Sequence, residues 1–383
     1  MALSYCTNVH PAEDLAGLVG QFDRYAVPVR DRLGTDGLHL GLWLAADVAR
    51  ELASDAGALA RLRRELTGRG LRVETLNAFP YQGFHDRVVK RMVYTPDWTD
   101  PQRLRYTVDC AQVLGGLLAD ESGYGSISTL PLGWRTRWGP AHDTAAEAAL
   151  TRATDALRAV SARYGRPVVL AVEPEPGCVL DTVDDAVRWL RSRVDPHYVG
   201  LCLDTCHLAV SFADPERTVE DIHAAGLRVM KVQVSAALEV PDPGEARSRA
   251  ALAEFAEPRY LHQVRECGSG GEVRAADDLP EALDALPARG PWRVHYHVPL
   301  HARPQEPLAA TTDVTRRALA ALHTVDGRRS PHLEVETYTW TVLPPRHRQE
   351  LADGIAAELA WAARNLPGPP AADLAAAAGG VLP

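Results

Sequence analysis

The chain has 383 residues, of which 46% are hydrophobic and 24% charged, a composition typical of a globular protein with a large core. A net charge of −9 argues against broad binding to nucleic-acid phosphates, and no apolar run reaches the roughly 18 residues of a membrane span. The N-terminal residues lack a signal-peptide pattern and the six cysteines lack CxxC spacing, so we expect a cytoplasmic protein with reduced thiols.

Strand and helix patterns alternate along most of the chain. Apolar runs bounded by turn residues predict nine strands, at residues 3–10, 39–44, 71–77, 125–130, 168–173, 199–204, 228–235, 292–301 and 332–338. Helical spacing predicts helices that include residues 11–33, 52–66, 101–118, 144–164, 312–323 and 346–366. This alternation is typical of a parallel α/β fold. We expect one (β/α)8 TIM barrel over residues 1–366, followed by a flexible tail at 367–383.

Nine strands compete for the eight places of such a barrel. The strand that carries Gln233 follows a regular helix after the Asp204 strand. The strand that carries His297 precedes a helix and then the Glu336 strand. Because both arrangements are regular, the sequence leaves open which strand is the seventh, and we expect both side chains to reach the pocket.

Residues 236–290 interrupt the alternation as an insertion near strands seven and eight. They contain a possible hairpin, residues 260–266 with 273–276, around a glycine-rich turn. Because the insertion follows a strand end, where barrel sites lie, we expect it to cap the pocket with Tyr260, His262 or Arg265 near a ligand. The alternative is a surface excursion or a contact between copies of the chain in a homo-oligomer.

Polar residues stand at or near the ends of five buried apolar runs. Glu173 is a clear case, because Pro174 and Pro176 after it cannot continue a central strand. In a barrel these ends converge on one mouth, and carboxylates packed there repel one another unless a cation is bound. We therefore predict a site for Mn²⁺, Mg²⁺ or Zn²⁺. Its expected ligands are Glu173, Asp204, Gln233, His297 and Glu336.

Three further residues have two interpretations each. His207, three residues after Asp204, is either a functional residue (a second ligand, or a catalytic residue that positions substrate) or a histidine at a helix start. His295 lies one pleat deeper than His297 and either contacts substrate or is packed and hydrogen-bonded. Lys231 shares a strand face with Gln233, so it points into the barrel and needs a carboxylate partner or a shifted pKa.

Two loops could shape a substrate pocket. Residues 78–85, after the third strand, are aromatic and suit a sugar-like ring, although they could equally form a satellite core. Residues 134–138, after the fourth strand, contain two arginines that could hold a carboxylate or phosphate or remain solvated. The substrate-binding candidates are Asn77, Phe79, Tyr81, His85, Trp134, Arg135, Lys231, His262 and His295.

The chain has no Walker loop, no GxGxxG at a strand-to-helix turn and no GxSxG elbow, which argues against nucleotide-cofactor and serine-hydrolase chemistry. Glu173, Leu-Asp-Thr-Cys-His (203–207), a polar seventh strand end and Glu336 resemble the xylose-isomerase-like TIM-barrel superfamily of sugar isomerases, sugar epimerases and endonuclease-IV-type enzymes. That resemblance implies that Glu173 and Glu336 flank a metal and exchange a proton beside a carbonyl, with Asp204 as a ligand. The family's strand-seven histidine is replaced here by Gln233 or supplied by His297.

A finer resemblance covers residues 3 to 365. The segments 3–11, 76–85, 126–134 and 231–235 are similar to the metabolite traffic protein EboE family. This family implies a cytoplasmic barrel with a role in making or moving a small metabolite. The first hypothesis is a metal-dependent isomerase or epimerase of a polyol, sugar or cyclitol-like metabolite. The alternative is a carrier that binds such a metabolite without turnover, whereas nucleic-acid hydrolysis fits poorly with the negative charge.

Overall fold

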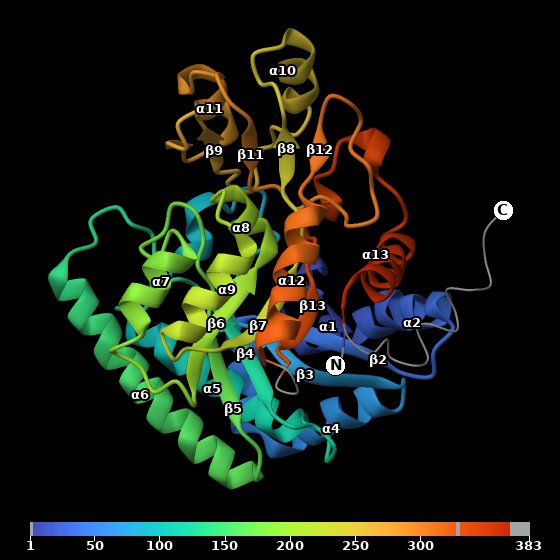
Figure 1. Cartoon of the computed structure of the whole chain (residues 1–383). Coiled ribbons are helices and arrows are strands. Elements are labelled where there is room, and N and C mark those ends of the chain that lie inside the picture. Colours follow the sequence, from blue (N-terminus) through green and yellow to red (C-terminus); the bar gives the residue numbers. More distant parts are fainter. Residues whose placement is uncertain (1–2, 327–329, 368–383) are drawn as a thin grey trace.

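Eight parallel strands close into a barrel in this computed structural model, which describes residues 3–326 and 330–367 (Figure 1). The strand order around the barrel is β1-β13-β7-β6-β5-β4-β3-β2. The strands are β1 (Leu3–Cys6), β2 (Leu38–Trp43), β3 (Leu71–Asn77), β4 (Gly125–Thr129), β5 (Val168–Val172), β6 (Val199–Asp204), β7 (Val229–Val234) and β13 (His332–Val335). The predicted (β/α)8 fold is confirmed. Each of β4, β5, β6 and β7 is buried along its whole length, as expected of strands covered by helices outside and side chains inside.

The helices form the outer layer of the barrel (Figure 1). They are α1 (Leu15–Gln21), α2 (Val27–Leu33), α3 (Ala46–Ser54), α4 (Ala56–Thr67), α5 (Pro101–Leu117), α6 (Pro140–Tyr164), α7 (Val183–Leu190), α8 (Thr205–Val210), α9 (Pro215–Ala224), α12 (Thr312–Asp326) and α13 (Leu351–Asn365). Side-chain caps begin many of them; Thr182 and Asp185 form a reciprocal capping box on α7. The helix predicted at 11–33 is interrupted by a π-helical turn at Phe22–Ala26.

The first strand is shorter than the predicted 3–10, because Thr7–Val9 forms a 3-10 turn at the barrel mouth. The described residues contain three other short 3-10 segments, at Lys90–Tyr94, Tyr338–Thr341 and Pro345–His347. No helix among the described residues is both long and apolar enough to cross a membrane. Apart from its first residue, the predicted tail at 367–383 lies outside the described residues.

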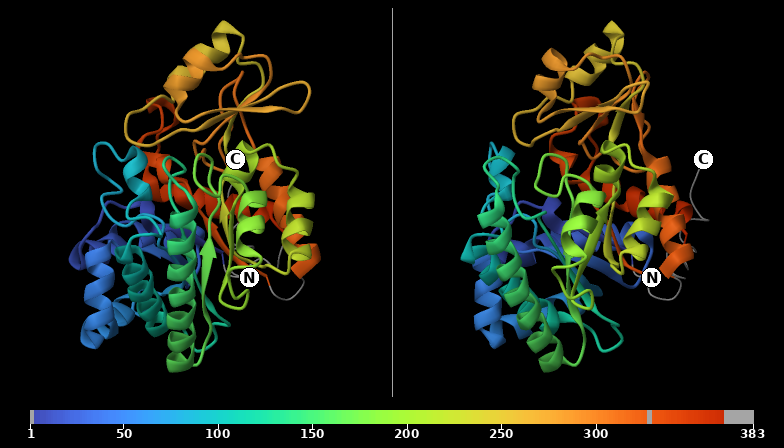
Figure 2. Two further views of the ribbon diagram at one scale, coloured as in Figure 1. Left: turned by 90° about the vertical axis from the view of Figure 1, so that its left-hand side faces the viewer. Right: turned by 60° about the vertical axis from the view of Figure 1, so that its left-hand side comes forward.

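A second, antiparallel sheet stands above the carboxyl ends of the barrel strands (Figures 1 and 2). It has the order β10-β9-β11-β8-β12 and carries two helices. Its elements are β8 (Leu238–Val240), α10 (Ala246–Ala253), β9 (Val264–Cys267), β10 (Val273–Ala276), α11 (Leu279–Ala285), β11 (Trp292–Val294) and β12 (Ala309–Ala310). We call residues 238–310 the cap; it is longer than the predicted insertion. The hairpin of β9 and β10 is confirmed.

The cap decides which predicted strand is accessory. The apolar run before His297 is β11, which pairs antiparallel with β8 and β9 rather than with the barrel. The strand that carries Gln233 is β7, which lies between β6 and β13, so it is the seventh barrel strand. Because β11 ends at Val294, His295 and His297 lie on an irregular segment that follows it.

An ion pair fills the barrel interior below the mouth. Lys231 Nζ lies 2.6 Å from Glu334 Oε2, and both side chains are fully buried. A Cβ atom at Gly41 would lie 1.2 Å from Glu334 Oε1, so only glycine leaves room for this carboxylate. The lysine thus has the carboxylate partner that its inward position demanded.

Candidate metal and substrate site

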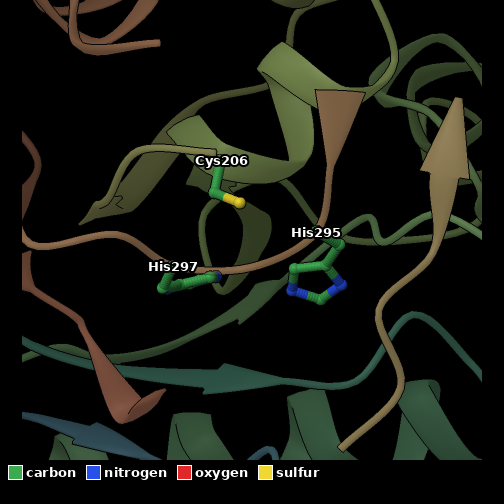
Figure 3. A group of neighbouring side chains, drawn as sticks. All are labelled: Cys206, His295 and His297. Carbon is green, nitrogen blue, oxygen red and sulfur yellow. The ribbon is translucent and has the colours of Figure 1, made fainter. Parts of the chain in front are cut away.

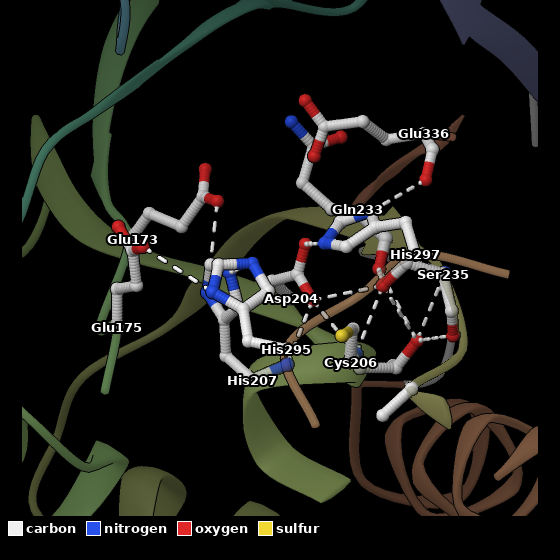
Figure 4. Close-up of polar contacts among 12 residues, drawn as sticks. Glu173, Glu175, Asp204, Cys206, His207, Gln233, Ser235, His295, His297 and Glu336 are labelled. Carbon is white, nitrogen blue, oxygen red and sulfur yellow. Dashed lines mark hydrogen bonds and ion pairs between the residues drawn. The ribbon is translucent and has the colours of Figure 1, made fainter. Parts of the chain in front are cut away.

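Three carboxylates meet at the barrel mouth (Figure 4). Glu173 follows β5, Asp204 ends β6 and Glu336 follows β13, and one oxygen of each lies within 4.8 Å of one oxygen of the other two. All three are buried. Burial, reinforced by Glu336 and Asp204, raises the pKa of Glu173 well above its ordinary value, and burial beside Asp204 does the same for the pKa of Glu336. A bound cation would remove this repulsion.

Neighbouring residues fix two of these carboxylates. Glu336 Oε1 accepts hydrogen bonds from the amides of Asn8 and Asn77, at 2.7 and 2.8 Å. Asp204 Oδ1 accepts from the backbone N–H groups of Cys206 and His207 at the start of α8, and from a serine hydroxyl. Its other oxygen, Oδ2, has no partner. The arrangement therefore turns one oxygen of Asp204 toward the shared space.

Several other polar atoms near the three carboxylates also lack a hydrogen-bond partner. Glu173 Oε2, Asp204 Oδ2, His297 Nε2 and both amide atoms of Gln233 are buried without a hydrogen-bond partner. Buried polar atoms are rarely left unpaired, so their clustering requires an explanation. His297 donates its Nδ1–H to the backbone carbonyl of Glu336 at 2.8 Å, which leaves a lone pair on Nε2, 3.8 Å from Asp204 Oδ2. These residues fit a divalent cation.

A second group of side chains lies beside the carboxylates. His207 Nε2 is 3.0 Å from His295 Nε2, and Glu175 joins both histidines in a possible ligand set. Burial raises the pKa of Glu175 to about 8 and lowers the pKa of His207 to about 4. Burial also lowers the pKa values of His295 and His297, so the imidazoles are neutral at pH 7.

A thiol also approaches the histidines (Figure 3). Cys206 Sγ forms a possible ligand set with His295 and His297. Burial raises the pKa of Cys206 well above its ordinary value, and the nearby Asp204 adds to this. Because a thiolate is the form that binds metal, the carboxylates are the better donors in this environment.

A cavity of about 60 Å³ lies between the carboxylates and the cap. This is below the roughly 300–1,000 Å³ of typical small-molecule sites. The cavity has a polar floor and a largely apolar wall. The wall residues are Phe79, Pro80, Phe84, Val89, Val93, Tyr94, Tyr260, Leu261 and Tyr338.

Contacts between the loop after β3 and the cap close this cavity. The backbone N–H groups of Val89 and Lys90 donate to the carbonyl of Arg259 in the cap, both at 2.8 Å. Lys90 Nζ forms a 2.6 Å ion pair with Asp278 and donates to the carbonyl of Tyr260. The cap therefore covers the pocket, with Tyr260 in its wall.

Three of the predicted substrate-binding residues, Asn77, Phe79 and His295, line the cavity. The other six are not among its lining residues: Tyr81 packs on Tyr106, His85 contacts the Asn8 carbonyl, Trp134 packs on Tyr94, Arg135 pairs with Asp277, Lys231 pairs with Glu334, and His262 contacts the His295 carbonyl. Arg265 pairs with Asp181. Each of these side chains already has a protein partner, and their contact with a substrate stays a prediction.

Sequence reasoning missed several residues of the site. Asn8 contacts Glu336, and its position just after the first strand was the signal that could have identified it. Tyr94 and Gln263 hydrogen-bond Glu175 but come from irregular segments. Glu175 itself is buried, with 4% of its surface exposed.

The fold and site define a (β/α)8 barrel with a carboxylate and imidazole cluster at the carboxyl ends of its strands. Residues 31–318, more than half of the chain, match the family model described as xylose isomerase-like TIM barrel, and the chain belongs to this family.

Solved structures with the same fold include two sugar epimerases. The chain is similar to D-allulose 3-epimerase from Methylomonas sp. in complex with D-allulose, with 14% identity, 94% of each chain covered and a TM-score of 0.51. It is also similar to a D-psicose 3-epimerase determined in the presence of D-fructose, with 11% identity, 96% of this chain and 100% of that chain covered, and a TM-score of 0.52. At these identities the similarity shows the fold alone. No curated protein sequence matches the chain.

Proposed function

We propose that the protein is a divalent-metal-dependent isomerase or epimerase of a sugar- or cyclitol-like polyol, acting in the biosynthesis or traffic of a small metabolite as an EboE-type protein. The observation that carries the proposal is the set of unpaired, buried donor atoms on Glu173, Asp204 and His297 beside Glu336. Buried polar atoms are rarely left unpaired, and these lie where barrel enzymes place their chemistry.

The metal would be held by Glu173, Asp204, His297 and Glu336, with the Gln233 amide oxygen as a further donor. Mn²⁺, Mg²⁺ and Zn²⁺ suit these ligands, and the mixture of oxygen and imidazole favours Mn²⁺ or Zn²⁺. When bound, the metal supplies polarisation of a substrate carbonyl and its neighbouring hydroxyl.

Glu173 and Glu336 are the groups placed to move a proton. Glu336 is fixed by Asn8 and Asn77, whereas Glu173 Oε2 is unpaired and free to take a proton from a carbon beside the carbonyl. Burial raises the pKa of both carboxyl groups above the ordinary value. His207, on the cavity floor, is placed to orient a substrate hydroxyl.

The wall of the cavity supports a ring-shaped polyol as substrate. Phe79, Phe84 and Tyr338 offer apolar faces, and the carboxylates and histidines of the floor offer polar groups. The cap excludes water, which protects a reactive carbanion-like state from side reactions. Because the closed cavity is small, substrate entry requires the cap or the loop after β3 to move.

A carrier without turnover is the second candidate function. It is favoured by one observation: the ion pair of Lys90 and Asp278 and two backbone hydrogen bonds join the loop after β3 to the cap beside the cavity, as a protein that covers a bound cargo would require.

Proton exchange separates the two functions. We would incubate manganese-loaded protein with a panel of sugars and cyclitols in D₂O and follow C–H exchange by NMR. The isomerase proposal expects exchange that falls by at least about 100-fold in Glu173→Gln, and remains unchanged in His223→Asn, an exposed control on α9. Thermal stabilisation by a polyol without exchange or isomerisation would instead identify a carrier.

A further inference from the structure

A second pocket lies against the outer side of the candidate site's wall. Its volume is about 470 Å³, and both the loop after β3 and the cap contribute to its lining. Val89, Lys90 and Leu261 line this pocket and also the cavity beside the carboxylates. We call the second pocket the outer pocket and these three shared residues the partition. Because the same residues face both spaces, the partition alone separates the outer pocket from the candidate site at this point.

The outer pocket presents apolar side chains to solvent. Among the described residues, the exposed large hydrophobic side chains are Val88, Met92 and Val273, and the first two line this pocket. Val88 is 56% exposed and Met92 is 68% exposed. Single exposed hydrophobic residues are normal on a protein surface, but a group of them beside a pocket indicates a binding surface.

The charged residues of the outer pocket pair within the protein. Lys90 Nζ lies 2.6 Å from Asp278, and Arg91 lies 3.1 Å from Asp277. Glu281 accepts a hydrogen bond from the backbone N–H of Asp277. An ionic ligand would have to displace these partners, whereas an apolar ligand would not. The chemistry of the outer pocket therefore favours an apolar ligand.

The partition depends on a few contacts between the loop and the cap. The backbone N–H groups of Val89 and Lys90 donate to the Arg259 carbonyl, and Lys90 Nζ donates to the Tyr260 carbonyl. Lys90 has a φ of 41°, in the left-handed region that is unfavourable for residues other than glycine. Such a conformation persists only where the surrounding contacts hold it, and it is found preferentially at ligand clamps and switches. Separation of the loop from the cap here would join the two pockets.

We propose that the outer pocket binds an apolar substituent, an alkyl or aryl group, of the same substrate whose hydroxyls face the carboxylates. The substrate class is then an amphiphilic polyol rather than a free sugar. This inference rests on the proposed function and deepens it by naming the substrate class.

The lining of both pockets supports a substrate with one polar and one apolar end. Val89 and Leu261 continue the apolar wall of the inner cavity into the outer pocket, where Val88 and Met92 extend it. A hydroxyl group placed along this path would lose its water without gaining a hydrogen bond, which is unfavourable. An apolar substituent has no such cost and leaves the polar end of the substrate at the carboxylate floor.

The test compares methyl and hexyl derivatives of the same polyols. Calorimetry would measure the binding of methyl and hexyl glucosides, mannosides and myo-inositol ethers to the manganese-loaded, full-length protein. Val88→Asp and Met92→Asp each place a charge in the outer pocket. Val273→Asp is the matched control, because Val273 is an exposed hydrophobic residue on β10 that does not line the pocket. Circular dichroism establishes that each variant is folded, and Met92→Gln serves if an aspartate variant does not fold.

We expect hexyl compounds to bind the wild type about 30-fold more tightly than their methyl counterparts. Each fully buried methylene strengthens binding by about 4-fold, and the hexyl chain has five more methylenes, which an open pocket covers by about half. This gain should fall below about 3-fold in Val88→Asp and Met92→Asp and persist in Val273→Asp.

The remaining outcomes separate this inference from the proposed function. A gain below about 3-fold in the wild type, or no binding of any hexyl compound, would overturn the outer pocket. A gain that Met92→Asp and Val273→Asp reduce equally would overturn it as well. Self-association of the wild type that Met92→Asp abolishes, without a hexyl gain, would assign Val88 and Met92 to a contact between copies of the chain instead. A hexyl gain that Met92→Asp removes, with no C–H exchange of any compound in D₂O, would support the outer pocket and count against the proposed isomerase.

Discussion

Replacing Lys231 by methionine should strongly destabilise the barrel. Lys231 Nζ lies 2.6 Å from Glu334 Oε2, neither side chain is exposed, and the lysine also contacts the Leu76 carbonyl and the Ser128 hydroxyl at 3.2 Å. Burial alone would lower the pKa of Lys231, but the pair with Glu334 raises it overall, so the lysine is charged. Lys231→Met leaves a buried carboxylate without a partner, and breaking such a pair reduces the free energy of unfolding by roughly 3–5 kcal/mol.

The double variant tests whether the pair is the cause. Lys231→Met with Glu334→Leu removes both charges, so urea unfolding should show most of the lost stability restored. Lys90→Met is the matched control, because Lys90 is the chain's other lysine and pairs with Asp278 near the surface. We expect it to change the free energy of unfolding by about 1 kcal/mol or less. Equal losses in Lys231→Met and Lys90→Met, or no recovery in the double variant, would refute the reasoning.

Three further predictions concern the mouth and its support. His297→Ala should weaken metal binding by at least about 100-fold and by more than Gln233→Ala, because an imidazole is the stronger donor; calorimetry that gives the reverse order would leave His297 outside the coordination sphere. Burial raises the pKa of Glu358 to about 7 from 4.5, so its contribution to stability is complete below pH 4.5 and is lost as the pH rises through 7. Between these values the wild type should lose about 3 kcal/mol more than Glu358→Gln in urea titrations, and parallel curves would contradict the shift. A bound polyol should slow amide hydrogen exchange at residues 89–94 and 259–262, and Lys90→Met should speed it; exchange unaffected by ligand would argue against an opening cap.

The barrel could be predicted because its signals are local. Each buried strand is a short apolar run between turn residues, and the alternation with helices leaves few topologies. The ninth strand could not be assigned, because Trp292-Arg293-Val294-His295-Tyr296-His297 alternates as a strand does. This run differs from β7 only in its partners, because it pairs with β8 and β9 instead of with barrel strands. The apolar pattern of a strand does not indicate which distant strand it pairs with.

The residues of the candidate site also fall into two groups, those that the sequence could predict and those that it could not. Glu173, Asp204 and Glu336 could be predicted, since the fold alone brings strand ends together. The supporting residues could not. Tyr94 and Gln263, which hold Glu175, come from irregular segments whose path is set by tertiary contacts. Lys231 was placed inside the barrel by strand parity, but only the structure shows that its partner is Glu334.

The proposed metal ligands come from two parts of the chain, the barrel and the cap, and this links metal binding to closure of the pocket. The carboxylates stand on the rigid barrel, whereas His295 and His297 stand on a segment of the cap. That segment is tied to the barrel by the hydrogen bond from Val298 N–H to the Ala236 carbonyl and by Glu358, which accepts from the Leu300 N–H at 3.0 Å and from Thr337, the residue after Glu336. A cation bound by both the barrel carboxylates and a cap imidazole would stabilise the closed cap. The stabilisation would equal the binding free energy that the imidazole contributes. Conversely, an open cap would leave only oxygen ligands, which suit Mg²⁺ better than Zn²⁺. With Gln233 on β7, the imidazole of the proposed metal site comes from His297 in the cap rather than from the barrel, so we expect the full ligand set to form only when the cap covers the barrel mouth.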